Sequence, residues 1–481
     1  MLKGRKRIYT DEKQINIGNV RKIVLDALVK HERNAIDIES LFKIAKGEME
    51  LVRKKEIRPE IDINAIDPIA SQIIDFKVGF EHGTPINYIQ RANIDSANPN
   101  GSIEETRKDD LRIATLNEMM REIDKAGKDL TLAEHIKKCG VGYRLVTPSR
   151  KRNAFSAFDI LILNPLRTFI IYSNDVYCRK MASVTYTVTE NTAIKKFGVY
   201  TDESYFEFDN TDNSSVSETV NEIGINPIVE YDNNDDIMGS FEKEIPLIDA
   251  LNVVTSDRVN DICQTVQSIL WLHNTKLDEQ QKEALVDGGV IQTQQTADGK
   301  DAKIQYINAP LNQTEIQTLA SSLKERILES AGVPKLSEAS NTTGEAMRVT
   351  NGWHTAETQA KISELMWRAS EDETLEICLE FIKKSNMNPN DVATLSLRDI
   401  DYKMYRSENY DIVSRVNAFA TLVNMGADLV KSAAYCKITD DPEQFIMDSK
   451  DGIDKIRFSA NEKVEIEDKT VESIQPDTVA F

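Results

Sequence analysis

The chain has 481 residues, of which 40% are hydrophobic and 29% are charged, and it carries a formal net charge of −20. Because this length exceeds what one hydrophobic core usually supports, two or more substructures are expected. No apolar run approaches the ~18 residues of a membrane span and no secretory signal opens the chain, so no membrane partner is expected. The acidity argues against proteins that grip nucleic acid through basic stripes.

Cysteines and histidines are scattered along the chain. Neither residue type shows the paired spacing of a zinc site or a redox motif, and no histidine pairs with a candidate nucleophile. The sequence therefore predicts no metal site, no cofactor and no catalytic residue, with the cysteines as small buried side chains. The five cysteines are Cys139, Cys178, Cys263, Cys378 and Cys436.

The N-terminal half reads as a mixed α+β body. Helices are predicted at 17–47, 68–81 and 103–125. After Gly140 the chain becomes rich in β-branched and aromatic residues, which favours strands. The strands are expected at 142–146, 158–163, 168–172, 183–188 and 205–208. The polar run 209–217 has many turn formers and no apolar anchor, so it predicts an exposed hairpin loop.

Two amphipathic segments follow, and each repeats its apolar residues every three or four positions. The first stripe begins at Ile248. The second segment opens with a capping box of Asn312 and Glu315, and Gly332 with Pro334 ends it. Two antiparallel helices that pack side by side are therefore predicted. The residues expected to pack in this pair are Ile262, Val266, Ile269, Leu319, Leu323 and Ile327.

The residues between these two helices predict a small folded tip. Two runs of alternating residues, 290–293 and 302–306, flank a turn, and Asp-Gly between such runs is a good hairpin signal. Helix pairs with a tip occur in many proteins, so this pattern alone does not identify a function. The turn consists of Thr296, Ala297, Asp298, Gly299 and Lys300.

The C-terminal part is mainly helical. A long helix is expected to follow Gly344 and to end near Ser385 and Asn386. A strand is predicted at 396–402 and two short helices at 410–425 and 428–436. The remaining tail is acidic and poorly patterned, which is typical of disorder.

Three sequence motifs resemble those of portal proteins of tailed bacteriophages. Asn64-Ala65-Ile66 precedes a helical segment with a turn at Gly79–Pro85, similar to the family's N-terminal helix and turn. Residues 226–252 resemble the approach to its first stem helix, and Thr343–Met347 resembles the small-residue signature ahead of a long helix. The order and spacing of these motifs cover roughly residues 20–450. On this resemblance the chain is identified as a member of the SPP1-like portal family of head-to-tail connector rings.

The resemblance implies an α+β portal fold with an α/β wing, a helical stem hairpin, a small α/β clip and a helical crown. In this layout the parts are the wing at 1–240 and 349–400, the stem helices at 241–272 and 312–333, the clip at 273–311, the channel loop at 334–348, the crown at 401–457 and an acidic tail at 458–481.

The resemblance also implies a structural role without enzymatic activity. The chain would form a homo-oligomeric ring, usually a dodecamer in this family, at one capsid vertex of the virion, after assembly in the host cytoplasm. Double-stranded DNA would pass through the ring during packaging and ejection. The partners would be the large terminase subunit, the head-tail connector or adaptor protein, and the major capsid and scaffolding proteins.

Two surfaces follow from the same resemblance. The turn Thr296–Lys300 would lie at the clip tip and dock first the motor and later the connector. A second segment would project into the channel and contact DNA. Its residues would be Lys335, Leu336, Ser337, Glu338, Ala339, Ser340, Asn341, Thr342, Thr343 and Gly344.

The charge admits two interpretations. In a channel for duplex DNA, an acidic lumen would repel phosphates and keep the DNA from sticking. Alternatively, the acidic residues simply keep the surface soluble. The charge is uneven, because the first 60 residues carry more Lys and Arg than Asp and Glu.

Other function classes stay open. A metal-dependent phage nuclease or another DNA-processing enzyme could use Asp257 and Asp261, which share a helix face, or the acidic run 232–236. The pair lacks a third acid, and the run lacks the glycine and distal glutamate of a calcium loop. The segment 125–129 lacks the spacing of a phosphate loop. A generic scaffold assembled through coiled helices is the remaining alternative.

Overall fold

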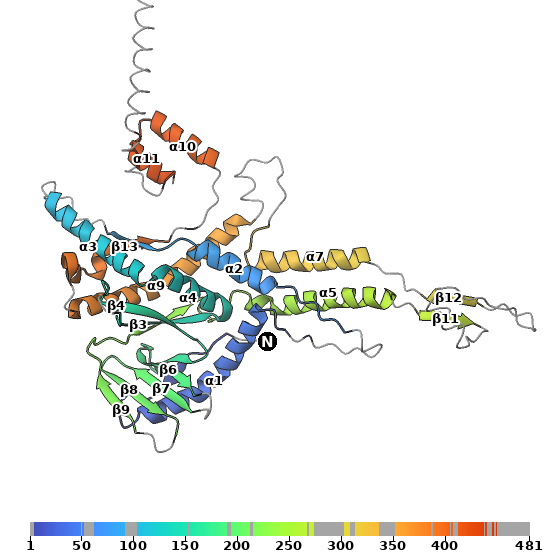
Figure 1. The fold of residues 1–481 in the computed structure, drawn as a ribbon, viewed down its shortest axis with the longest axis horizontal. Helices are drawn as coiled ribbons and strands as arrows, with labels where there is room; N and C mark the ends of the chain where they lie inside the picture. Colours follow the sequence, from blue (N-terminus) through green and yellow to red (C-terminus); the bar gives the residue numbers. More distant parts are fainter. Residues whose placement is uncertain are drawn as a thin grey trace, which may run out of the picture. The chain divides into compact units, whose positions relative to one another are not determined.

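The computed structural model describes residues 4–49, 51, 62–91, 103–151, 154–189, 194–211, 215–266, 269–273, 303–307, 313–335, 352–385, 388–404, 406, 412–436, 438–439, 445–446 and 449. By its internal contacts the chain divides into two units, Met1–Ser407 and Glu408–Phe481. Figure 1 shows the mixture of helices and strands, which confirms the predicted α+β class.

The larger sheet of the first unit has six strands and is covered on one face by a helix (Figure 1). Its order is β1-β5-β6-β7-β8-β9, with β1 parallel to β5 and the other neighbours antiparallel. Inward-facing residues such as Phe169, Val184 and Phe206 bury against the apolar stripe of α1 (Val20–Ala45). The strands are β1 Ile8–Thr10, β5 Thr168–Ser173, β6 Lys180–Val188, β7 Lys195–Tyr200, β8 Ser204–Asp209 and β9 Ser217–Val220.

A second sheet and its helices build the main core of this unit. The sheet has the order β10-β3-β4 and is antiparallel throughout. A separate pair joins β2 to β13, so the chain beyond α9 returns to the region before α3. The elements are α2 Ile69–His82, β2 Asn87–Gln90, α3 Ile103–Glu122, α4 Lys125–Cys139, β3 Val141–Pro148, β4 Phe158–Leu163, β10 Ile228–Asp232, α9 Trp353–Lys384, η3 Pro389–Thr394, η4 Leu397–Asp399 and β13 Ile400–Lys403.

The helix pair predicted at 241–272 and 312–333 is present with different ends. A short 3-10 turn, η2 (Glu242–Glu244), leads into α5 (Ile245–Val266), and its partner is α7 (Gln313–Ser330). The prediction that Ile269 continues the first helix was wrong, because β11 (Ile269–His273) starts there. β11 consists largely of aliphatic and aromatic residues, and pairing with another strand outweighs the continued helical spacing.

The second tip strand is present, and its described partner lies outside the predicted hairpin, whose pairing with 290–293 stays a prediction. β12 (Lys303–Ile307) overlaps the predicted strand at 302–306, but it pairs with β11, with Ile269 opposite Ile307. Alternation within a run predicts a strand but does not choose its partner. The run 290–293 and the turn Thr296–Lys300 lie outside the described residues.

The two units meet C-terminal to position 400, where the sequence predicts the boundary between wing and crown. β13 pairs with β2, with Ile400 opposite Gln90, so the residues just after position 400 belong to the first unit. The predicted strand at 396–402 begins late because a capping box between Ser396 and Asp399 closes a 3-10 turn first.

The second unit contains the two short helices expected near the C-terminus. α10 covers Ile412–Asn424 and α11 covers Leu429–Tyr435, and both lie within the predicted ranges. Both predictions are therefore confirmed. The tail at 458–481 lies outside the described residues.

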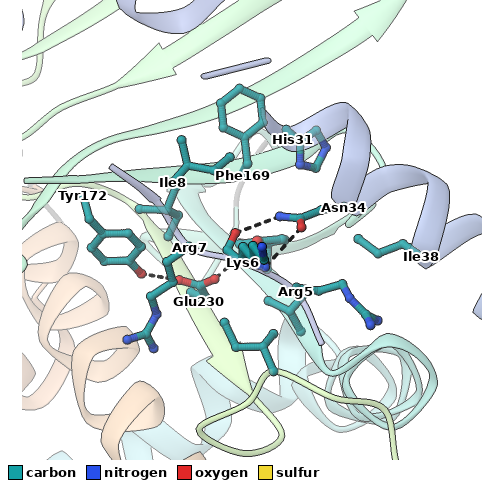
Figure 2. A pocket seen from close by; sticks show the side chains of 14 residues that line it. Arg5, Lys6, Arg7, Ile8, His31, Asn34, Ile38, Phe169, Tyr172 and Glu230 are labelled. Carbon is teal, nitrogen blue, oxygen red and sulfur yellow. Dashed lines mark hydrogen bonds between the residues drawn. The ribbon is translucent and has the colours of Figure 1, made fainter. Parts of the chain in front are cut away.

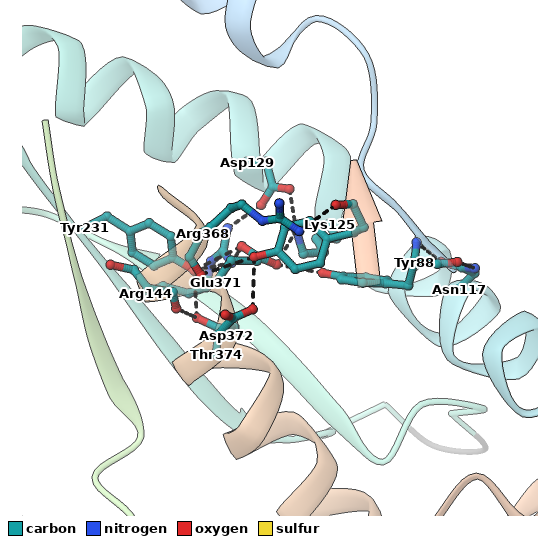
Figure 3. Close-up of polar contacts among 12 residues, drawn as sticks. Tyr88, Asn117, Lys125, Asp129, Arg144, Tyr231, Arg368, Glu371, Asp372 and Thr374 are labelled. Carbon is teal, nitrogen blue, oxygen red and sulfur yellow. Dashed lines mark hydrogen bonds and ion pairs between the residues drawn. The ribbon is translucent and has the colours of Figure 1, made fainter. Parts of the chain in front are cut away.

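A buried cluster of charged side chains locks α9 onto the smaller sheet (Figure 3). Glu371 of α9 is fully buried, and its carboxylate lies 2.9 Å from Lys125 Nζ and 2.8 Å from Arg144 Nη1. The Tyr88 hydroxyl donates to the same carboxylate at 2.6 Å. Burial alone would raise the pKa of Glu371, but the two cations outweigh burial and hold that pKa well below its usual range. Glu371 is thus ionised and joins α9, α4, β3 and β2.

The N-terminal residues Arg5–Ile8 line a small pocket together with residues of α1, β5 and β10 (Figure 2). Arg5 is buried and pairs with Glu242, and Arg7 donates to Asp232 at 2.7 Å. Beside them a cavity of about 20 Å³, also lined by His31 and Tyr172, has room for about one water molecule. These contacts explain how a three-residue strand, β1, stays at the sheet edge.

Glu230 of β10 is expected to make the free energy of unfolding depend on pH. It is fully buried and accepts a hydrogen bond from Tyr172, with Arg7, Lys180 and Asp232 nearby. Burial and the neighbouring Asp232 raise its pKa from the usual 4.5 to about 7.

Between these two pH values the folded chain holds a proton on Glu230 that the unfolded chain has lost, so the free energy of unfolding should fall as pH rises. Glu230→Gln should gain stability relative to the wild type across this window, on the order of 3 kcal/mol. Urea titrations at pH 5 and pH 7.5 measure this difference. An equal difference at both pH values would contradict the protonation of Glu230.

Candidate stem and channel-loop base

The helices α5 and α7 lie side by side, with the β11–β12 pair beyond their far ends (Figure 1). At the start of α5 and the end of α7, apolar residues belong to the main core of the first unit, where Ile248, Leu251 and Ile327 are buried. Polar contacts join α7 to η2, just before α5, and to α5 itself. Ser330 of α7 donates to Glu244 at 2.7 Å, and Arg258 of α5 donates to Gln317 of α7.

Toward the β11–β12 end of the helix pair, the apolar side chains are only half buried. Ile262 of α5 is 42% exposed and Leu319 of α7 is 50% exposed, whereas Leu323 is partly buried against the core. The side chains of Val266 and Ile269 lie outside the described residues. Among the stripe residues whose side chains are described, Ile327 is fully buried, whereas Ile262 and Leu319 are not covered within one chain.

The segment predicted as channel loop has a closed base. A Cβ on Gly352, the residue before α9, would lie 4.0 Å from the Cα of Pro334, so the chain leaves and returns at one place. Lys335 is described and pairs with Glu325 of α7. The other predicted loop residues, Leu336–Gly344, lie outside the described residues.

Gly332 marks the point where α7 meets α9. Its φ is +73°, and a Cβ there would lie 2.2 Å from the side-chain oxygen of Gln359. The positive φ favours glycine, and a side chain there would also displace the Gln359 amide. Lys77 of α2 donates to the same Gln359 oxygen at 3.2 Å. Burial, and next the charge of Lys137, lower the pKa of Lys77 to about 8.

Aromatic residues of α2 hold the first turn of α9. The Phe76 and Phe80 rings stack with centroids 5.5 Å apart, and the Trp353 ring lies 6.0 Å from the first and 5.9 Å from the second. Ala356 and Ala360 pack against the same cluster. α2 thus contacts the start of α9, and Gln359 of α9 lies between Lys77 of α2 and Gly332 at the end of α7.

The metal-dependent alternatives can be compared with the described residues. No three His, Cys, Asp or Glu side chains among them gather closely enough to hold a metal ion. Asp232, the first acid of the run 232–236, is engaged by Arg7. Within the described part of the chain we also find no helix whose length and apolar content would carry it through a bilayer.

The comparisons with known proteins decide the family. The model described as phage portal protein, SPP1 Gp6-like, matches residues 28–453. The chain belongs to the SPP1-like phage portal family. A solved structure described as the neck of an empty GTA particle, computed with C6 symmetry, resembles it with 9% sequence identity and a TM-score of 0.46, covering 81% of this chain and 95% of that chain. No curated protein matches this chain.

Membership of the portal family confirms the resemblance found in the sequence. Portal proteins form oligomeric rings in phage particles and belong to the head-tail connector. The half-exposed stripe of α5 and α7 is what a subunit of such a ring should show, because each copy can cover the stripe of its neighbour. The residue roles in stem, clip and channel loop remain predictions.

Proposed function

We propose that this portal protein forms the channel at one capsid vertex through which double-stranded DNA is packaged by the terminase motor and later ejected. The observation that carries the proposal is the closed loop base at Pro334 and Gly352, next to a helix pair whose apolar stripe is half exposed. A ring of such pairs would surround a hole, and each loop would project from the same level of it.

The parts are assigned on this basis. The wing comprises the first unit without the helix pair, α5 and α7 form the stem, and β11 and β12 begin the clip. The second unit, with α10 and α11, forms the crown. The residues from Lys335 to Gly344 form the channel loop, and Thr296–Lys300 form the clip tip.

The partners follow from these parts. The clip tip would dock the large terminase subunit during packaging and the head-tail connector afterwards. The wing would contact the major capsid and scaffolding proteins during assembly in the host cytoplasm. The ring would be a dodecamer at the portal vertex of the virion. The net charge of −20 supports passage without adhesion, because acidic walls repel phosphates.

Deleting Ser337–Thr342 tests the channel loop. The deletion removes no residue of the packing stripe and leaves the base at Gly332, Pro334 and Gly352 intact, so rings should still form. Packaged DNA per capsid, or its retention after packaging, should fall because the channel loses its inner constriction. Quantifying DNA in purified capsids measures both effects.

A length-matched control separates the constriction from the local sequence. Replacing the same six residues by glycine and serine keeps the length of the loop and should preserve most of the packaging and retention. Normal packaging and retention in capsids that carry the deletion would contradict the assignment of this segment to the channel.

A further inference from the structure

An extended segment, Asp62–Asp67, runs along α5 and is bound through its backbone. Asn260 accepts from the Ile63 N–H at 2.9 Å and donates back to its carbonyl at 3.0 Å. The Ser256 hydroxyl accepts from the Ala65 N–H at 2.9 Å and donates to the Ala65 carbonyl at 3.2 Å. Asn252 accepts from the Asp67 N–H at 2.9 Å. Asn252, Ser256 and Asn260 follow one another at intervals of four residues on α5 and together form a ladder of hydrogen bonds to the segment.

The spacing of the ladder matches an extended chain. Four helical residues rise about 6 Å and two extended residues rise about 6.6 Å, so every second residue of the segment meets every fourth residue of α5. All three ladder side chains are nearly inaccessible to solvent: Asn252 and Ser256 are 0% exposed and Asn260 is 2% exposed. Buried polar groups cost stability unless paired, so the ladder holds this segment specifically in an extended form.

The same segment contacts the second stem helix and then enters the loop base. The Asp67 carboxylate lies 3.1 Å from Lys324 Nζ of α7. Two residues later the chain begins α2, whose Lys77, Phe76 and Phe80 contact Gln359 and Trp353 of α9. A continuous series of contacts therefore runs from both stem helices through Asp62–Asp67 and α2 to the base of the loop.

We propose that Asp62–Asp67 is a tether that sets the position of the channel-loop base according to the position of the stem, with Asn252, Ser256 and Asn260 as its positioning residues. This inference rests on the proposed function for the meaning of the loop, but the mechanical link itself does not. A shift of α5 along its axis would pull on α2 through the ladder. The base of the loop would move with the stem.

Ser256→Ala in assembled rings tests the tether, because it removes both bonds to Ala65 at little cost in volume. Hydrogen–deuterium exchange of peptides covering 62–67 should accelerate about tenfold. The peptide covering 353–360 at the start of α9 should also exchange faster, and packaged DNA should be retained less well. Ser256→Thr keeps a hydroxyl and should restore part of each property.

A control and a second variant keep the test decisive. Thr255→Ala removes a hydroxyl one residue away from the ladder and should leave both peptides unchanged. If Ser256→Ala fails to assemble, Lys324→Met releases the tether on the α7 side through a partly exposed pair and should act in the same direction.

Faster exchange of 62–67 with no change at 353–360 would overturn the tether. A different outcome is that Ser256→Ala speeds exchange at both places while the separate deletion of Ser337–Thr342 leaves packaged DNA unchanged. That outcome would refute the channel-loop assignment and leave the tether standing.

Discussion

Glu371→Ala is expected to lower the free energy of unfolding by about 3–5 kcal/mol. The substitution leaves Lys125 and Arg144, both buried, with Asp129 as the remaining carboxylate of the cluster. Removing one member of a buried ionic cluster leaves an uncompensated charge in a medium of low polarity, which costs more than the lost contact itself. Urea unfolding followed by circular dichroism measures the loss.

Glu373→Ala, two residues further along α9, is the matched control. Glu373 is 39% exposed and pairs with Lys180 near the surface, so its removal should cost about 1 kcal/mol or less. Glu371→Gln keeps the shape and part of the hydrogen bonding and should fall between the two. A loss below about 1 kcal/mol for Glu371→Ala would show that the cluster does not hold α9 on the sheet.

Leu319→Asp combined with Ile262→Asp is expected to abolish ring assembly while each subunit stays folded. Both side chains are about half exposed in the single chain, so the substitutions should cost the subunit little stability. In the ring each would place a carboxylate in a contact that excludes water, which costs several kcal/mol per site and is repeated at every interface. Native mass spectrometry of the purified variant measures the loss of rings.

Volume-conserving substitutions serve as the control for assembly. Leu319→Met and Ile262→Leu keep an apolar side chain of similar size and should retain rings. Rings of normal mass in the double aspartate variant would mean that the α5–α7 stripe does not form the contact between copies.

The sequence predicted the periodic elements well and their ends less well. The spacing of apolar residues located α5, α7 and α1, and the run at 158–163 coincides with β4. It did not place the end of α5, because the residues that begin β11 continue the helical spacing. Only pairing with β12, far along the chain, decides that segment in favour of a strand.

The helix α4 was missed although the sequence carried its signal. Leu132, Ile136 and Cys139 are buried at helical intervals, Asp124 caps the start through the Gly127 N–H, and Gly140 closes the end with a φ of +86°. The segment 125–129, which lacks the spacing of a phosphate loop, forms the first turn of α4. Its Lys125 instead belongs to the buried charged cluster.

The ladder and the charged cluster could not be predicted from the sequence. Asn252, Ser256 and Asn260 share a helix face, but a polar stripe is usually solvated, and its partner lies almost 200 residues earlier. Glu371 likewise meets Arg144 only after the sheet and α9 have packed. Both features depend on contacts between distant segments, which local patterns do not specify.

A cryo-electron microscopy map of the purified wild-type ring that resolves its helices and traces its backbone tests the central claim most directly. The account predicts a closed ring with an axial channel in which the α5–α7 pairs lie nearest the axis and the loop bases at Gly332 and Gly352 face the channel. A ring in which these helix pairs lie on the outer rim, with another element lining the channel, would contradict it.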